Sequence, residues 1–275
     1  MGKRTWANLR DDVEVKLTDT GNATFAEATI DEYMKDILVD EVSDRVPVEV
    51  LEVLTATASR EYSLYTITNL LRVLDVEYKV AQWPRCWRNF KVQGYSLFID
   101  LDDTPTAGNS IYVWCAKPQR ITETSDLAGA VKLLHAAGET DIDIDGLAAA
   151  DTIYADTCFT IAGDTTVYRV TADVALAGNE GNFSIYPALQ AAAADDAVVT
   201  FETSTLTPEL ERIFSTLVAG KLAIDYAQTK INVVNDSGVT VPDRYLNWGT
   251  LKWNEAIAKL EAMRKPRVYR RHPTS

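Results

Sequence analysis

Few residues of this sequence have the type and spacing that a metal ion requires. The segment Asp141–Gly146 reads D-x-D-x-D-G, the opening of a calcium-binding loop in which carboxylates occupy alternate positions. The ninth and twelfth positions of such a loop are Ala149 and Thr152, so the glutamate that completes a calcium site is missing. The alternation favours an edge β-strand instead, with Ile142 and Ile144 facing inward and the aspartates facing solvent.

The residues that commonly carry out catalysis or bind zinc are sparse. The only histidines, His135 and His272, have no cysteine or second histidine at ligand spacing, so no zinc site is expected. The three cysteines, Cys86, Cys115 and Cys158, lie far apart without a C-x-x-C pair, which fits a reducing compartment. No G-x-S-x-G, G-x-G-x-x-G or Walker loop is present. We therefore expect a protein that is not an enzyme and has no catalytic residue, metal or cofactor.

A further group of aromatic and basic residues could stack against a ligand. A stacking platform of this kind would suit a sugar or single-stranded nucleic acid. Tryptophan, tyrosine and arginine are also enriched in subunit interfaces, and aromatic residues fill the cores of small sheets. We favour this second role, in the core and at an interface. The group consists of Trp83, Trp87, Tyr95 and Trp114, with Arg85, Arg88 and Lys91.

The charge of the chain is acidic and unevenly distributed. The 275 residues include 27 basic and 40 acidic side chains, for a net charge of −13. Residues Glu139–Glu202 contain twelve acidic residues and one basic residue, Arg169, a local charge of −11 that leaves −2 for the remainder. This balance argues against a protein that grips duplex DNA, because neutralising phosphates requires clustered cations.

Neither a membrane span nor a secretory signal is expected. No uncharged apolar run approaches the ~18 residues that a membrane-spanning helix needs. The first dozen residues lack the apolar segment of a secretory signal. We expect a soluble protein that is made inside the cell.

The C-terminal segment Arg264–Ser275 reverses the charge of the chain. Such a segment could be a solvated, disordered end. An apolar pair among forked cations instead suits docking into an acidic groove of a partner, with ordering on binding, and we favour this role. The expected docking residues are Arg264, Lys265, Arg267, Val268, Tyr269, Arg270 and Arg271.

Helical periodicity marks both ends of the chain. Thr5 is expected to cap a helix over residues 6–17, and Thr24 a second helix with Glu27 as in a capping box. Thr207 and Pro208 are expected to start a third helix, and Asp243 a fourth that Pro266 ends. Apolar and small residues of the last two helices are expected to pack subunits together. These residues are Leu217, Gly220, Trp253, Ile257 and Leu260.

Between these helices the hydrophobic period falls toward two. Six strands are expected between residues 50 and 115, and short sequence separations favour antiparallel hairpins. Leu127–His135 is expected to form a short bridging helix, and Pro187–Ala194 one or two helical turns, because alanine favours helix. Five strands are expected in the acidic segment. They cover residues 141–145, 158–162, 165–171, 183–186 and 198–202.

The sequence therefore predicts an α+β fold with an inserted all-β module. A helical bundle from the N- and C-terminal helix pairs would combine with a small antiparallel sheet in a body of residues 1–136 and 206–264. The acidic β-domain would be residues 137–205, and the basic tail residues 265–275.

Several segments resemble the head-to-tail connector proteins of tailed phages, also called adaptor or neck proteins. The opening of these proteins resembles residues 5–17, 19–22 and 25–33. The shared motifs are L-R-D-D-V, D-T-G-N and I-D-E-Y-M. The R-E-Y and L-L-R-V-L-x-V-E-Y segments of these proteins resemble residues 59–64 and 70–78. Their next hairpin resembles residues 94–101 and 111–118. Their closing helices resemble residues 220–230 and 246–263. Residues 159–168 and 184–189 resemble a β-module inserted into various phage virion proteins.

The resemblance implies a structural protein of the virion neck, made in the host cytoplasm. Its copies would form a ring, normally a homododecamer, that docks on the portal protein and contacts head-closure or tail proteins. Double-stranded DNA would pass through the ring without sequence-specific contact, no membrane would be involved, and the C-terminal segment would reach into the portal. Two alternatives remain: a head-closure, tail-terminator or tail-tube subunit, and a host-surface or calcium-binding β-module protein.

Overall fold

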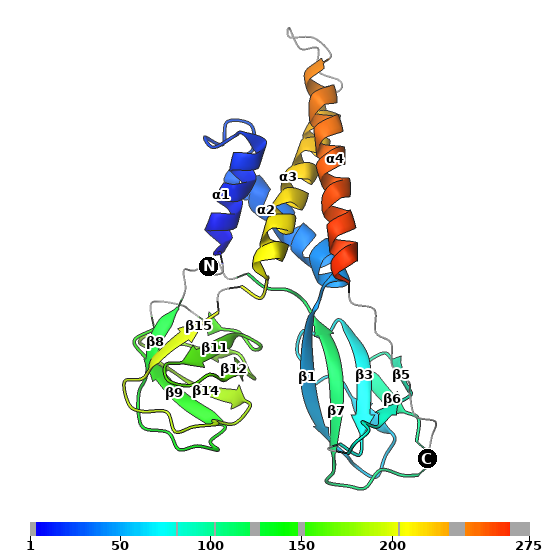
Figure 1. Ribbon diagram of the computed structural model, residues 1–275, viewed down its shortest axis with the longest axis vertical. Coiled ribbons are helices and arrows are strands. Elements are labelled where there is room, and N and C mark those ends of the chain that lie inside the picture. The colour runs from blue at the N-terminus through cyan, green and yellow to red at the C-terminus, as the bar shows by residue number, and fades with distance from the viewer. Residues whose placement is uncertain are drawn as a thin grey trace. The chain divides into compact units, whose positions relative to one another are not determined.

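The computed structural model describes residues 4–80, 82–101, 103–121, 127–147, 152–202, 204–230 and 240–264. Within these residues the fold is mixed α+β, with four α-helices and several antiparallel sheets (Figure 1). The chain divides into two compact units. The first contains Met1–Thr24 and Arg120–Ser215, and the second contains Phe25–Gln119 and Thr216–Ser275.

Helix α1 (Trp6–Leu17) belongs to the first unit and begins where the sequence predicts. The Thr5 side chain caps it by accepting a hydrogen bond from the Asn8 N–H at 3.3 Å. Its apolar side chains Trp6, Leu9, Val13 and Leu17, spaced three or four residues apart, are buried. The Arg4 N–H donates to Glu211 Oε1 at 2.8 Å, and Lys16 Nζ donates to Ser215 Oγ at 2.7 Å. These bonds attach α1 to the first turns of α3 (Pro208–Lys230).

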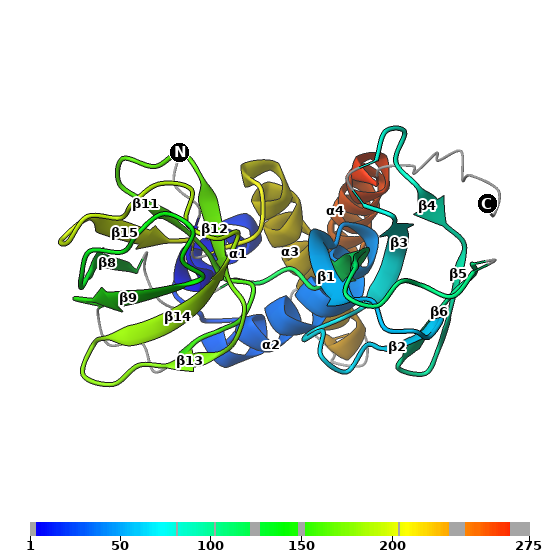
Figure 2. The same cartoon turned by 90° about the horizontal axis from the view of Figure 1, so that it is seen from below.

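A closed six-stranded barrel forms the rest of the first unit. Its strands follow one another around the barrel in the order β11, β12, β14, β9, β8 and β15, and every pair is antiparallel (Figure 2). A small two-stranded ladder, β10 (Thr152–Ile153) with β13 (Val174–Ala175), accompanies it. The barrel strands are β8 (Ala128–Val131), β9 (Asp141–Asp145), β11 (Cys158–Ile161), β12 (Val167–Val170), β14 (Gly181–Tyr186) and β15 (Val198–Phe201).

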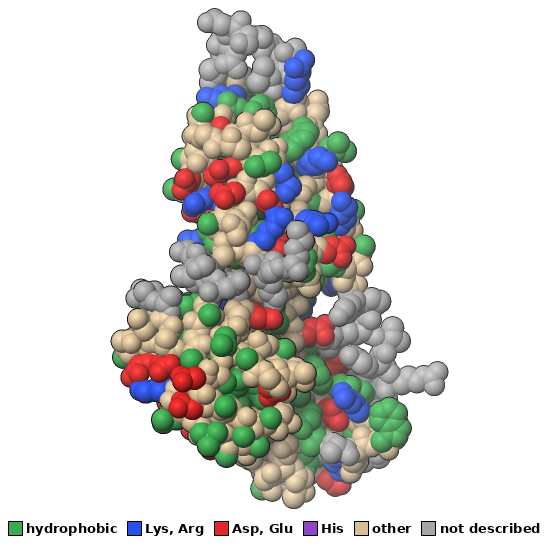
Figure 3. All heavy atoms as spheres, turned by 60° about the vertical axis from the view of Figure 1, so that its left-hand side comes forward, with side chains coloured by type: hydrophobic (Ala, Val, Ile, Leu, Met, Phe, Trp, Pro, Cys, Tyr) green, Lys and Arg blue, Asp and Glu red, His purple; other side chains and the backbone are tan. Residues whose placement is uncertain are grey.

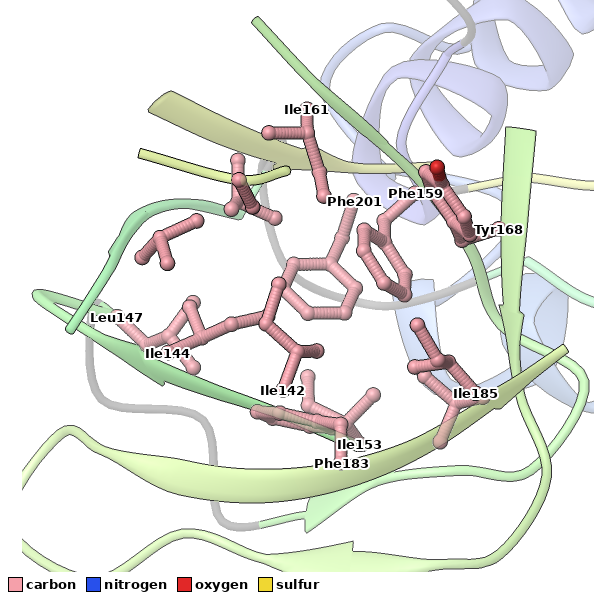
Figure 4. Close-up of a cluster of buried hydrophobic side chains, with 14 of the residues drawn as sticks. Ile142, Ile144, Leu147, Ile153, Phe159, Ile161, Tyr168, Phe183, Ile185 and Phe201 are labelled. Atoms are coloured by element: carbon pink, nitrogen blue, oxygen red, sulfur yellow. The ribbon is translucent and has the colours of Figure 1, made fainter. Parts of the chain in front are cut away.

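Inward-facing side chains from all six strands fill the barrel. Phe201 lies at 5.2 Å from Phe159 and 5.5 Å from Phe183 between ring centroids, and all three rings are buried (Figure 4). Ile142 and Ile144 point into the same core, so β9 alternates as the sequence predicts. It is not an edge strand, however, because β14 and β8 pair with its two sides. Closing a sheet into a barrel removes its edges.

Two predicted helical segments of this unit are wrong. The segment expected as a helix over Leu127–His135 contains strand β8. Pro187–Ala194 forms no helical turn, because its backbone bonds to other parts of the barrel. The Leu189 N–H donates to the Glu139 carbonyl at 2.9 Å, and the Gln190 N–H donates to the Tyr168 hydroxyl at 3.0 Å. These tertiary bonds outweigh the helix propensity of alanine.

Helix α2 (Glu27–Ile37) opens the second unit and continues as a π-helix, η1 (Leu38–Ser43). The predicted cap at Thr24 is wrong. Ala26 occupies the cap position without a side-chain hydrogen bond. Ile30, Met34, Ile37, Leu38 and Val42, spaced at helical intervals, are all buried.

Two sheets complete the second unit, and their strand pairs are antiparallel as predicted. The predicted pairing at short sequence separation is correct only for β3 with β4 and β5 with β6, since β1 and β3 pair with β7 and β2 pairs with β6. One has the order β1–β7–β3–β4 and the other β2–β6–β5. A cluster of apolar side chains from both sheets, including Val76, Leu97 and Val113, forms their common core. The strands are β1 (Val48–Thr55), β2 (Glu61–Ser63), β3 (Arg72–Tyr78), β4 (Trp87–Arg88), β5 (Phe90–Gln93), β6 (Ser96–Ile99) and β7 (Ser110–Lys117).

The last two helices are long. Helix α3 begins at Pro208 as predicted, and the Thr207 Oγ1 accepts a hydrogen bond from the Leu210 N–H at 3.3 Å. Helix α4 (Thr240–Met263) begins before the predicted Asp243. In the second unit, the Tyr33 hydroxyl of α2 donates to Asp225 Oδ2 of α3 at 2.9 Å. Arg45 Nε donates to Glu261 Oε1 of α4 at 2.9 Å.

The bond between Tyr33 and Asp225 gives a testable pH dependence. Burial and this hydrogen bond raise the pKa of Tyr33 from 10.0 to about 12. Because the folded pKa is the higher one, the neutral phenol stabilises the folded state fully below pH 10.0 and loses this effect as the pH rises toward 12. Tyr33→Phe should therefore lower the free energy of unfolding by about 1 kcal/mol at neutral pH.

Urea denaturation over a pH series measures this effect. The difference between wild type and Tyr33→Phe should shrink above pH 10.0, where the unfolded phenol ionises. Tyr65→Phe is the control, since Tyr65 is exposed and its hydroxyl has no hydrogen-bond partner among the described residues. A difference that stays constant up to pH 12 would contradict the assigned role of the hydroxyl.

The compact units divide the chain differently from the predicted domains. Helix α1, expected in a body of residues 1–136 and 206–264, groups with the barrel. The barrel core already includes Leu127, ahead of the predicted boundary at residue 137. Helix α3 begins in the first unit and ends in the second.

Candidate assembly surfaces

Helices α3 and α4 approach each other closely where they cross. A Cβ atom added to Gly249 would lie 2.7 Å from the Gly220 carbonyl oxygen, and one added to Gly220 would lie 3.0 Å from the Trp253 nitrogen. Real Cβ atoms are essentially never found within 3.0 Å of another atom, and a contact of 3.0 Å is tighter than nine in ten real Cβ contacts. The crossing therefore depends on the absence of both side chains.

This crossing determines which of the predicted subunit-packing residues remain accessible. Leu217, Gly220 and Leu260 are buried within the second unit, so their surfaces are already occupied by the same chain. Trp253 and Ile257 are half-buried and keep part of their surface available. The packing of one subunit on another stays a prediction, and these last two residues are the ones that can contribute to it.

The outer face of α4 is mainly polar. Glu255 accepts hydrogen bonds from Lys259 at 2.7 Å and from Lys252 at 3.2 Å. These bonds lower the pKa of Glu255 and keep the carboxylate charged. Leu251 is the exposed apolar residue beside them. This face suits a water-exposed or weakly apolar contact more than a buried one.

The predicted docking tail begins at the end of α4. Arg264 is exposed, and its Nη1 lies 3.9 Å from Glu261 Oε2. The other predicted docking residues, Lys265, Arg267, Val268, Tyr269, Arg270 and Arg271, lie outside the described residues, as does His272.

The aromatic and basic cluster expected from the sequence is divided between core and surface. Arg88 is buried, whereas Trp87 and Trp114 are half-buried on β4 and β7. Trp83 is 92% exposed, and Tyr95 is exposed in a stack with Tyr65, at 4.3 Å between ring centroids. Only part of the predicted core role is therefore correct, and exposed aromatic rings remain for an interface.

The loop between β3 and β4 carries the most exposed of these rings. We call residues 79, 80 and 82–87 the tryptophan loop. Its Lys79, Trp83 and Arg85 are all exposed. The guanidinium carbon of Arg85 lies 6.0 Å from the centroid of the Trp87 ring, within the range of a cation–π contact. The loop thus presents apolar and cationic groups to solvent together.

The aspartates of the partial calcium motif do not converge on a metal site. In strand β9 they alternate with buried isoleucines, and Asp143 Oδ1 accepts a hydrogen bond from Asn182 Nδ2 at 2.9 Å. Among the residues that the structure describes, no group of three or more His, Cys, Asp or Glu side chains could hold a metal ion. Likewise, no helix in the described ranges is both long and apolar enough to cross a membrane.

His135 has a structural environment in the barrel. Its Nε2 accepts a hydrogen bond from the Asp143 N–H at 3.1 Å, so the ring proton lies on Nδ1 and is donated to Glu139 Oε2 at 2.6 Å. This bond and one from the Ala136 N–H lower the pKa of Glu139. The imidazole therefore joins the turn after β8 to strand β9.

The turn after β8 exposes apolar side chains among acidic ones. We call Lys132–Leu134 the leucine turn, in which Leu133 is 57% and Leu134 is 72% exposed. Lys132 Nζ donates to Glu180 Oε2 at 2.6 Å, and this bond raises the pKa of Lys132. Sequence reasoning missed this surface because it assigned the segment to a helix. Two adjacent leucines beside a lysine were the only signal.

Comparison of the chain with protein-family models, with curated proteins and with solved structures finds no match.

Proposed function

We propose that this chain is a structural subunit of a phage virion neck. Its copies form a ring at the portal vertex that joins the head to the tail and lets DNA pass. The observation that carries the proposal is the order of elements. Two helices open the chain, two long helices close it, and sheets and a barrel lie between them. The segments that resemble connector proteins fall on those helices and on β2, β3, β6 and β7.

Contacts between the terminal helices support a common helical bundle. Arg4 and Lys16 bond α1 and its N-terminal flank to α3, and Tyr33 bonds α2 to α3. Arg45, just after η1, bonds to Glu261 of α4. The residues joined by these bonds lie about two hundred positions apart in the sequence.

The charge of the chain supports passage of DNA without binding. A subunit with a net charge of −13 offers few cations to phosphates, and salt weakens its repulsion of DNA. The proposed partners are further copies of the chain in a dodecamer, the portal protein, and head-closure or tail proteins. The protein is made in the host cytoplasm and then incorporated into the virion.

Electron microscopy of the purified protein, alone and mixed with a portal protein, tests the ring. We expect closed rings with a central channel in at least one of the two samples. A chain that stays monomeric in both, or that turns over a substrate as a monomer, would contradict the proposal.

Removal of residues 267–275 tests the docking role of the tail. The truncated chain should lose binding to the portal, because the truncation removes three arginines that would pair with acidic groups there and removes the apolar pair Val268 and Tyr269 with them. Co-sedimentation with portal rings measures this binding. A variant with Val268→Ser and Tyr269→Ser keeps every charge and separates the apolar from the ionic contribution. Undiminished docking of the truncated chain would refute the tail assignment.

A further inference from the structure

The tryptophan loop has the properties of a docking element. Trp83 is 92% exposed and is followed by the exposed Pro84. The loop therefore presents to solvent an apolar surface that other parts of the chain leave accessible. Tryptophan is among the residues that most often dominate binding at protein interfaces. A ring exposed to this degree stabilises nothing within its own chain.

The charge around this loop is the opposite of that of the protein. Between Glu77 and Asp100 the sequence has four basic residues and no acidic one. Two of them, Lys79 and Arg85, belong to the loop, and neither forms an ion pair with any residue that the structure describes. The loop therefore presents an apolar centre with a cationic rim.

The leucine turn on the barrel is also apolar at its centre. Backbone hydrogen bonds fix its place, since the Lys132 N–H donates to the Asp143 carbonyl at 2.9 Å and the Asp196 N–H donates to the Val131 carbonyl at 2.9 Å. The turn thus lies between β9 and the segment that precedes β15. Leu133 and Leu134 project from it with more than half of their surface exposed.

Acidic residues surround this turn. On the face of the barrel that Figure 3 shows, acidic side chains gather beside apolar ones. Lys132 bonds to Glu180 and is the basic residue among them. Asp145 and Asp195 form no ion pair within the described part of the chain. The acidic residues in question are Glu139, Asp143, Asp145, Glu180, Asp195 and Asp196.

We propose that the tryptophan loop of one copy docks on the leucine turn of a second copy. Apolar centres would meet, and rims of opposite charge would surround them, which is the usual anatomy of a specific interface. The occupant is a second copy because the complementary acidic and apolar surface is present on the same chain. The inference rests on the ring proposed above and names one contact within it.

A contact of this kind is compatible with a ring. The loop and the turn are different surfaces, so in a ring each copy uses one to contact the copy ahead and the other to contact the copy behind. Head-to-tail contacts close into rings when the rotation between copies allows it. A two-fold dimer in which each copy gives its loop to the turn of the other would use the same contact, so the rotation between copies decides between a dimer and a ring.

Charge reversal on each surface tests the proposal in the full-length protein. The loop variant carries Lys79→Glu and Arg85→Glu, and the barrel variant carries Asp145→Lys and Asp195→Lys. Each variant alone should associate at least tenfold more weakly than wild type in analytical ultracentrifugation. An equimolar mixture should assemble again, because every contact then joins one reversed loop to one reversed turn or one native loop to one native turn.

The mixture distinguishes contacts between copies from contacts within one chain. If a chain with all four substitutions assembles but the mixture does not, the contact lies within one chain and the proposal is overturned. The proposal is also overturned if both variants assemble as wild type does, although the ring would stand. A wild-type chain that never assembles, with or without portal, contradicts the ring as well.

Two controls separate the interface from a general loss of charge or fold. Lys91→Glu reverses an exposed charge in the same acid-free segment but outside the loop, and it should leave assembly unchanged. Trp83→Ala should weaken association at least tenfold, whereas Tyr65→Ala, at a ring that is 75% exposed elsewhere in the same unit, should not. Equal effects of the two aromatic substitutions would overturn the role of the loop.

Discussion

Phe201→Ala is expected to cost the barrel about 3–5 kcal/mol of its free energy of unfolding. The Phe201 ring is buried and contacts the rings of Phe159 and Phe183 on two other strands. Removing it leaves a cavity at the centre of the core, and a closed barrel cannot collapse around that cavity without breaking ladder bonds. Amide hydrogen exchange of the barrel strands measures the loss and locates it in the first unit.

Val198→Ala on the same strand is the matched control. Val198 is mostly exposed, and its substitution should change the free energy of unfolding by no more than about 0.5 kcal/mol. Exchange in β11, β12 and β14 should accelerate in Phe201→Ala and stay unchanged in Val198→Ala. Similar exchange rates in the two variants would show that the three rings do not act as one core.

The sequence predicts most of the elements because their hydrophobic patterns are strong. The helix around Leu9 and Val13 has an apolar stripe and a capping threonine, and both appear in the structure. Strand β9 alternates so regularly that Ile142 and Ile144 could be assigned to the core. What the pattern does not reveal is the number of neighbours that a strand has. Acidic residues suggested an edge, whereas both sides of β9 are paired.

Strand β8 escapes prediction because barrel closure requires small residues there. A Cβ atom on Gly129 would lie 2.6 Å from the Asp145 carbonyl oxygen and 2.7 Å from a Leu147 methyl group. Glycine and alanine therefore occupy the strand in spite of their low β-propensity. Local propensity then favours a helix, and only the three-dimensional pairing with β9 and β15 reveals the strand.

The sequence names candidate residues for assembly surfaces but not their contacts. The small residues of α3 indicated a close helix contact, and the basic aromatic segment indicated an interface, but neither identified its partner. Gly249 lies on another helix, and no periodicity links it to Gly220. The exposure of Trp83 could not be anticipated either, since composition does not distinguish a ring in a core from a ring on a loop.

Gly249→Ala is expected to destabilise the helix pair α3–α4. At an exposed position of a helix this substitution would raise the free energy of unfolding by about 1 kcal/mol, because alanine has a higher helix propensity than glycine. Here the new Cβ would lie 2.7 Å from the Gly220 carbonyl oxygen and 3.0 Å from a methylene of Ile224, so the helices must separate. Overpacking of this kind typically costs about 1–3 kcal/mol. Urea denaturation followed by the fluorescence of Trp248 and Trp253, which flank the site, measures the net effect.

Thr250→Ala tests whether propensity or contact controls this position. Thr250 is exposed next to Gly249, so its substitution gains helix propensity without entering the crossing and should stabilise slightly. If Gly249→Ala lowers the free energy of unfolding and Thr250→Ala raises it, the close backbone approach of α3 and α4 is required for stability. If Gly249→Ala stabilised the protein as well, the two helices could not approach as closely as the glycine pair allows.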